Sequence, residues 1–147
     1  MDKVWLQMCE AAGVDAEKRL AARQAVLESA EAVECTVYRP DENDPDAEEL
    51  DLGEARILFD GPFVAPDDWS DEECEEFFGD DDPEQFVSAR IECEAAPASS
   101  AYFLPEIGDY LAALPGQGEV VMFYVHDCEE DDDGLHCVLI RDDVQLL

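Results

Sequence analysis

The sequence predicts one α+β domain, a mostly antiparallel sheet of about four to six strands with two to four helices packed on it. Three observations lead to this prediction. Apolar residues recur at helical spacing near the N-terminus, later segments alternate apolar and polar residues, and 47% of the 147 residues are hydrophobic, enough for one core. We find neither an internal repeat nor a linker long enough to separate two domains, so residues 1–147 are treated as one unit.

The N-terminal part is predicted to be helical. A helix is expected over Asp2–Ala12, and Asp15 is placed to cap a second one over roughly Ala16–Val33. Residues 1–33 contain six acids and four bases, so this part is nearly neutral, with a net charge of −2. The acidic, sheet-containing part, residues 34–147, therefore carries −30 of the total charge of −32.

Three strands are predicted in the first two thirds of the chain, at Cys35–Arg39, Ala55–Phe59 and Phe86–Cys93. In the third strand, apolar residues alternate with polar ones such as Arg90 and Glu92. This alternation is typical of an antiparallel strand with one buried face and one face in water.

Two more helices are predicted between and after these strands. Ser70 suits the N-cap of a short helix over Asp71–Phe78, with Glu73 completing a capping box. Pro105 suits the first turn of another helix, because four apolar residues follow at helical spacing: Ile107, Tyr110, Leu111 and Leu114.

The C-terminal segment carries the strongest β pattern. Val120–Cys128 and Leu135–Ile140 are expected to form a hairpin that turns at Glu129–Gly134, and Val144–Leu147 would extend it or add a short strand. A tight turn there would make His126 and Cys137 near cross-strand neighbours on one face. Two side chains placed in this way could form a Cys–His nucleophile or part of a zinc site. A disulfide between Cys128 and Cys137 is a further alternative. Ordinary strand residues are the simpler interpretation of all three, because no second pair of ligands with recognisable spacing accompanies them.

The acidic residues are concentrated in two segments. Residues 41–54 hold eight acids and are interpreted as an exposed loop. Eleven of the eighteen residues in Asp67–Glu84 are carboxylates, with no lysine or arginine among them, yet Trp69, Phe77 and Phe78 lie in the same run. Disordered acidic tails usually lack aromatic residues, so this run indicates a folded acidic surface.

Charge and composition exclude several classes of function. A net charge of −32 excludes conventional binding to nucleic acid and disfavours anionic membranes, because both need lysine and arginine. The sequence has no secretory signal and no apolar run approaching the ~20 residues that span a bilayer, and its six cysteines show no CxxC spacing. We therefore expect a cytoplasmic protein with reduced thiols.

No catalytic or cofactor motif is found. The sequence lacks a P-loop, GxGxxG, GxSxG and HExxH, and it has a single threonine and few serines as hydroxyl nucleophiles. Glu129–Gly134 resembles a calcium loop only superficially, since Ile140 occupies the position that needs a bidentate glutamate. We accordingly predict a protein that is not an enzyme and needs no cofactor or metal.

The acidic surface suggests a cationic partner. The leading hypothesis is a small cytoplasmic inhibitor that occludes a basic protein, such as an immunity protein or antitoxin acting on a toxin of nucleic acid or nucleotides. The alternatives are a phage or plasmid protein that mimics nucleic acid, and a protein kept in solution at high salt by its acidity. The predicted partner-binding residues lie in one run: Asp67, Asp68, Trp69, Asp71, Glu72, Glu75, Glu76, Phe78, Asp80, Asp81 and Asp82.

Overall fold

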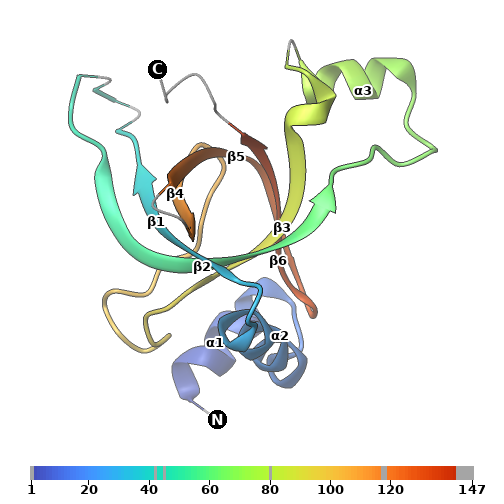
Figure 1. Ribbon diagram of the computed structural model, residues 1–147. Coiled ribbons are helices and arrows are strands. Elements are labelled where there is room, and N and C mark those ends of the chain that lie inside the picture. Colours follow the sequence, from blue (N-terminus) through green and yellow to red (C-terminus); the bar gives the residue numbers. More distant parts are fainter. Residues whose placement is uncertain (1, 42, 45, 80, 117–118, 142–147) are drawn as a thin grey trace.

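A closed antiparallel β-barrel forms the body of the protein (Figure 1). The computed structural model describes residues 2–41, 43–44, 46–79, 81–116 and 119–141. These residues form α1 (Lys3–Ala12), α2 (Ala16–Glu28), β1 (Val33–Arg39), β2 (Leu50–Pro62), α3 (Asp71–Phe78), a 3-10 helix η1 (Pro83–Gln85), β3 (Phe86–Cys93), β4 (Tyr110–Gly116), β5 (Glu119–Asp131) and β6 (Gly134–Arg141). The predicted α+β class and antiparallel sheet are confirmed, and the closure of the sheet is new.

The barrel consists of two three-stranded meanders. Its strand order is β1-β2-β3-β6-β5-β4, and each strand is antiparallel to both neighbours. The long connection between β3 and β4 returns the chain beside β1, which gives the Greek-key order β4-β1-β2-β3. Among the described residues, closure therefore gives every strand a neighbour on both sides.

The main hydrophobic core fills the barrel. Side chains from all six strands meet inside it, each at most 7% exposed: Cys35, Val37, Ala55, Ile57, Ala89, Ile91, Leu111, Ala113, Phe123, Val125, Leu135, Cys137 and Leu139. On β3 the predicted alternation is present, with Ala89 and Ile91 inside. The outer face of β3 is nevertheless buried at both ends, because Phe86 packs on Phe78 and Glu92 bonds to Arg19 of α2.

Helices α1 and α2 pack together below the barrel in the view of Figure 1. Asp2 and Asp15 accept hydrogen bonds from the first turns of the two helices, as the sequence predicts for Asp15. The Trp5 indole is buried and donates to the carbonyl oxygen of Ala16 at 3.0 Å. Arg19 lies over the Trp5 ring, with its Cζ 5.7 Å from the ring centroid.

Arg19 fastens α2 to the barrel. Its guanidinium is fully buried and donates two hydrogen bonds to Glu92, at 2.7 and 3.2 Å, and one to Glu130 at 2.8 Å. Burial alone would lower the pKa of Arg19, but the hydrogen bonds and charges of Glu92 and Glu130 outweigh it and raise that pKa. Burial raises the pKa of the Glu92 carboxyl, and Arg19 offsets part of that effect. Sequence periodicity places Glu92 on a solvated face, and this expectation is wrong.

The helix expected after Pro105 is a strand. β4 covers Tyr110–Gly116 and pairs with β1 on one side and β5 on the other. Leu111 is buried in the barrel while Leu114 is exposed, as strand alternation requires. A run of seven residues is too short for its apolar pattern to distinguish the helical period from the strand period. The strand is favoured because β4 satisfies the backbone hydrogen bonds of two neighbouring strand edges at once.

Several boundaries also differ from prediction. α2 ends at Glu28 instead of Val33, and β2 begins at Leu50, which shortens the predicted acidic loop. Strand pairing in the last hairpin extends to Asp131 opposite Gly134, leaving a two-residue turn. The residues of the expected strand Val144–Leu147 lie outside the part of the chain that the structure describes.

Candidate functional site

The acidic run forms a lobe that projects from the barrel between β2 and β3 (Figure 1). We call residues 63–85 the acidic lobe. α3 has the predicted bounds, and Ser70 accepts the predicted hydrogen bond from the backbone N–H of Glu73 at 3.1 Å. Three acids lie in the first turn of α3, where the positive end of the helix dipole favours them.

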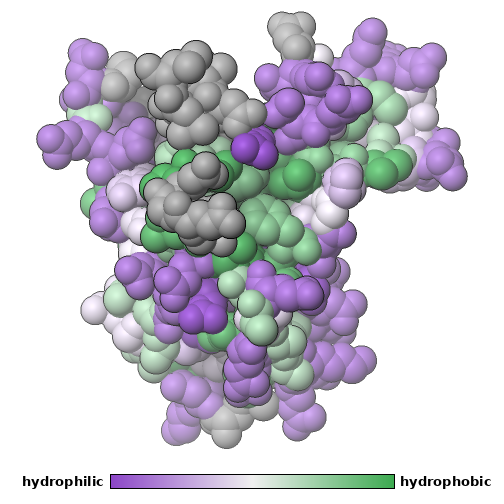
Figure 2. Space-filling view, in the orientation of Figure 1, coloured by the Kyte–Doolittle hydropathy of each residue, from purple (hydrophilic) through white to green (hydrophobic). Residues whose placement is uncertain are grey.

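Aromatic side chains form a small second core inside the lobe. Phe77 stacks on Phe63 with 5.0 Å between ring centroids, and it contacts Trp69 at 5.1 Å. Phe78 contacts the buried Phe86 of β3 edge to face at 4.8 Å. Trp69 and Phe78, predicted as partner-binding residues, are half-buried in this cluster. Figure 2 shows hydrophilic side chains at the outer edge of the lobe and hydrophobic ones where it meets the barrel.

His126 connects the lobe to β5. The strand register shifts between Val125 and Asp127, so His126 occupies a β-bulge. Its ring lies edge to face with Phe77 at 4.7 Å, and its Nε2 donates to the carbonyl oxygen of Phe77 at 2.6 Å. The predicted pairing of His126 with Cys137 is therefore wrong. The two-residue turn sets Cys128 opposite Cys137, and at the bulge the His126 ring lies against the lobe. No motif in the sequence marks this bulge.

The predicted acidic residues that the structure describes share the outer surface of the lobe. All are exposed: Asp67, Asp68, Asp71, Glu72, Glu75, Glu76, Asp81 and Asp82. Asp80 lies outside the described residues. None of the ion pairs found in the described part of the chain involves a carboxylate of the lobe.

Five arginines are engaged elsewhere. Arg39 pairs with the buried Asp109, Arg56 with Glu34 and Glu94, and Arg90 with Asp60, in addition to the Arg19 cluster. Arg23 donates to the carbonyl oxygens of Cys93 and Ala95. Arg19, Arg39, Arg56 and Arg90 therefore neutralise carboxylates near the barrel wall, while the negative charge of the lobe faces solvent.

The three acidic segments do not form one patch. The loop before β2 and the acidic lobe stand on different sides of the barrel in Figure 1, whereas the β5–β6 turn lies near the N-terminal helices. Asp132 in that turn accepts a hydrogen bond from the backbone N–H of Asp15 at 2.7 Å, and Glu130 pairs with Arg19. Part of the charge in the β5–β6 turn is thus used inside the protein, and the lobe is the densest exposed segment.

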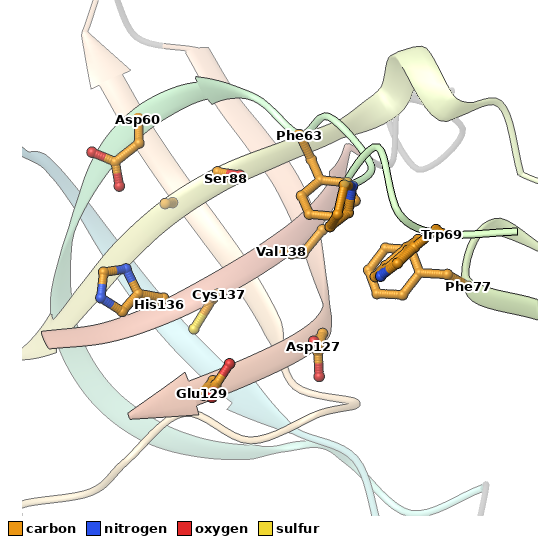
Figure 3. Close-up of a pocket in the computed structure, with 12 residues that line it drawn as sticks. Asp60, Phe63, Trp69, Phe77, Ser88, Asp127, Glu129, His136, Cys137 and Val138 are labelled. Atoms are coloured by element: carbon orange, nitrogen blue, oxygen red, sulfur yellow. The ribbon is translucent and has the colours of Figure 1, made fainter. Parts of the chain in front are cut away.

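A cleft of about 300 Å³ separates the lobe from the outer wall of the barrel (Figure 3). Phe63, Trp69 and Phe77 gather at one end of it. The barrel supplies the remaining lining: Asp60 from β2, Ser88 and Ala89 from β3, Asp127 and Glu129 from β5, and His136, Cys137 and Val138 from β6, with Pro66 of the lobe. His136 Nε2 contacts Asp131 at 3.0 Å, and Asp60 is held by Arg90.

The lining of the cleft suits a cationic group. Aromatic faces attract ammonium and guanidinium groups, and the nearby Asp127 and Glu129 carry negative charge. Neither carboxylate has a basic partner among the ion pairs that the structure describes. The sequence could not reveal this cleft, because its residues come from five separate segments of the chain.

The zinc site considered from the sequence gains no support. The described residues bring together no group of three or more His, Cys, Asp or Glu side chains suited to holding a metal. All six cysteines are free, and four of them are buried: Cys9, Cys35, Cys93 and Cys137. Within the described part of the chain, no helix has the length and apolar character needed to cross a membrane.

The fold and site together define a closed six-stranded barrel with an anionic, aromatic-cored lobe beside a cleft. No protein family, curated protein or solved structure was found to match this chain.

Proposed function

We propose that this protein is a small cytoplasmic inhibitor that binds a basic protein through its acidic lobe. The preferred partner is a toxin that acts on nucleic acid or nucleotides, which makes this chain an immunity protein or antitoxin and not an enzyme. One observation carries the proposal: the lobe presents ten described, exposed carboxylates without a cation among the described ion pairs, on a folded aromatic core. A partner with a cationic substrate cleft offers the complementary charge.

The mechanism is electrostatic attraction followed by occlusion. The negative field of the lobe accelerates encounter with a positive surface, and the effect weakens as salt screens it. Because α3 is fixed to the barrel by packing and by the His126 hydrogen bond, its carboxylates are held in place before binding. Such preorganisation reduces the entropy lost on association.

The cleft gives this interaction a specific anchor. A lysine or arginine of the partner would place its charge near Asp127 and Glu129 and its alkyl chain along Trp69 and Phe77. In this proposal Trp69 lines the cleft that receives a side chain of the partner, and it does not insert into a pocket of the partner. Buried arginines and aromatic residues dominate the energetics of many interfaces.

The nucleic-acid mimic remains the second candidate. A mimic needs carboxylates strung along an extended face, as phosphates are along a duplex. The separation of the three acidic segments and the compact shape of the lobe favour the single-partner inhibitor. The binding experiment below distinguishes the two functions and also tests whether the acidity only maintains solubility.

The test compares two variants with the same change in net charge. The lobe variant carries D71N, E72Q, E75Q and E76Q, which leaves Ser70 and Glu73 to cap the helix. The control variant carries D41N, D44N, E48Q and E49Q in the loop before β2. Each tagged protein is used to capture partners from the native lysate, with elution from ~0.1 to ~1 M salt.

The expected result is one basic protein retained by the wild type and the control but lost from the lobe variant. The wild type should also abolish the activity of that protein, and the lobe variant should associate at least about tenfold more slowly at low salt. Equal loss from both variants would show nonspecific attraction. Retention of many unrelated nucleic-acid-binding proteins would favour the mimic, and no retention would contradict the proposal.

A further inference from the structure

Two of the six cysteines face each other across the last hairpin. Cys128 of β5 is the direct register partner of Cys137 of β6, and their Sγ atoms are 2.8 Å apart. One thiol donates a hydrogen to the other. Among the described contacts, none of the remaining cysteines has a second sulfur as its hydrogen-bonding partner.

The backbone at this pair already suits a disulfide. Directly opposed residues of antiparallel strands have Cα atoms about 4.5 to 5.5 Å apart, which falls within the range found for disulfides. Bond formation needs a sulfur–sulfur distance of about 2.05 Å, so the two side chains have less than about 1 Å to travel. Neither strand has to change its register.

The two thiols differ in access. Cys137 is 2% exposed and faces the barrel interior, although it also forms part of the cleft lining. Cys128 is half-buried, so a small oxidant meets this sulfur first. Two causes raise the pKa of Cys137 well above its ordinary value. The larger is the hydrogen bond with the Cys128 thiol, and the second is burial. A raised pKa disfavours the reactive thiolate, so Cys137 is not suited to meeting the oxidant itself. Its position directly opposite Cys128 makes it the sulfur that can reach an oxidised Cys128.

We propose that Cys128 and Cys137 form a reversible disulfide when the protein meets hydrogen peroxide. Peroxide transfers one oxygen to the Cys128 sulfur, giving a sulfenic acid and one molecule of water. The Cys137 sulfur then attacks the Cys128 sulfur, the S–O bond breaks, and the departing hydroxide takes the thiol proton as a second water. The two thiols together supply the two electrons that reduce one peroxide, and a dithiol reductant restores them.

The bond would tie β5 to β6 beneath the cleft. Asp127 and Glu129 flank Cys128 on β5, while His136 and Val138 flank Cys137 on β6. Oxidation would therefore fix the relative positions of the cleft residues supplied by these two strands. This inference rests on the thiol geometry alone and is independent of the proposed partner.

The experiment treats the reduced, folded protein with hydrogen peroxide and measures the intact mass. The expected product is a monomer lighter by about 2 Da, with two of its six thiols no longer titratable after denaturation. Proteolysis at Asp131–Asp133 without reductant separates Cys128 from Cys137, so a disulfide appears as two linked peptides. Dithiothreitol should restore the original mass.

Two substitutions identify the pair. C9S removes a buried cysteine of α1 and should leave the linked peptides unchanged, whereas C137S should abolish them and leave Cys128 to gain oxygen. If C137S does not fold, the peptide map of the wild type decides the question. A wild type that keeps both thiols, gains oxygen at Cys128 without losing about 2 Da, or links only between molecules would overturn the proposal.

Discussion

Replacing Arg19 by methionine should destabilise the protein severely. The substitution removes three hydrogen bonds, two to Glu92 and one to Glu130. Glu92 is 2% exposed, so without Arg19 it must either keep an unpaired buried charge or take up a proton, and both cost stability. Removing one partner of a buried ion pair typically costs about 3–5 kcal/mol.

Urea unfolding measured by circular dichroism at constant salt and pH 7 provides the assay. With a slope of about 2 kcal/mol per molar, the expected loss moves the midpoint down by about 2 M. Trp5 packs against Arg19, so its fluorescence should report the same transition. The penalty should shrink at pH 5, where protonation of Glu92 is less costly.

Two controls separate the buried charge from a general loss of arginine. R90M removes a partly exposed pair with Asp60 and should cost less than about 1 kcal/mol. The double variant R19M/E92Q removes the buried carboxylate as well and should recover at least about 1 kcal/mol relative to R19M. If R19M costs no more than R90M, or if E92Q worsens R19M, the account of this ion pair is wrong.

Two further predictions concern the whole acidic molecule. The melting temperature should rise between about 0.1 and 1 M salt, because salt screens repulsion among the unpaired carboxylates of the lobe; an unchanged value would show that this repulsion is unimportant. The free energy of unfolding should also rise as pH falls from 7 towards about 5. Burial raises the pKa of Glu92 above its ordinary value of 4.5, so the native state binds more protons than the unfolded state. The contribution of Glu92 to stability is therefore fully present below pH 4.5 and is lost as pH rises through the raised pKa. E92Q should flatten this pH dependence, and an identical slope in the wild type and E92Q would assign it to other carboxylates.

Local sequence signals were sufficient for the features that depend on neighbouring residues. The caps at Asp15 and Ser70 and the alternation in β3 all predicted the observed elements. The prediction that the aromatics in the acidic run belong to a folded surface is also consistent with their packing beneath α3. These signals work because helix starts and strand faces are fixed by residues a few positions apart.

Features that depend on distant partners were missed. The segment now in β4 was expected to be helical, because its few apolar residues fit either period until β1 and β5 offer hydrogen bonds on both edges. The alternation in β3 predicts a solvated Glu92, but Arg19, which lies 73 positions away in the sequence, covers this side chain. The expected pairing of His126 with Cys137 is absent because the two-residue turn sets Cys128 opposite Cys137, and the β-bulge at His126 places that ring against Phe77 of the lobe.

The sequence by itself determined an acidic α+β domain, its densest carboxylate run and the aromatics within that run, because composition and short-range spacing carry this information. Only the tertiary structure decided that the sheet closes, that Arg19 and Arg90 pair with carboxylates near the barrel wall, and that a cleft lies beside the acidic lobe. The physical reason is that closure, burial of charge and the shape of a cleft depend on which distant residues meet, and one-dimensional patterns leave those meetings unspecified.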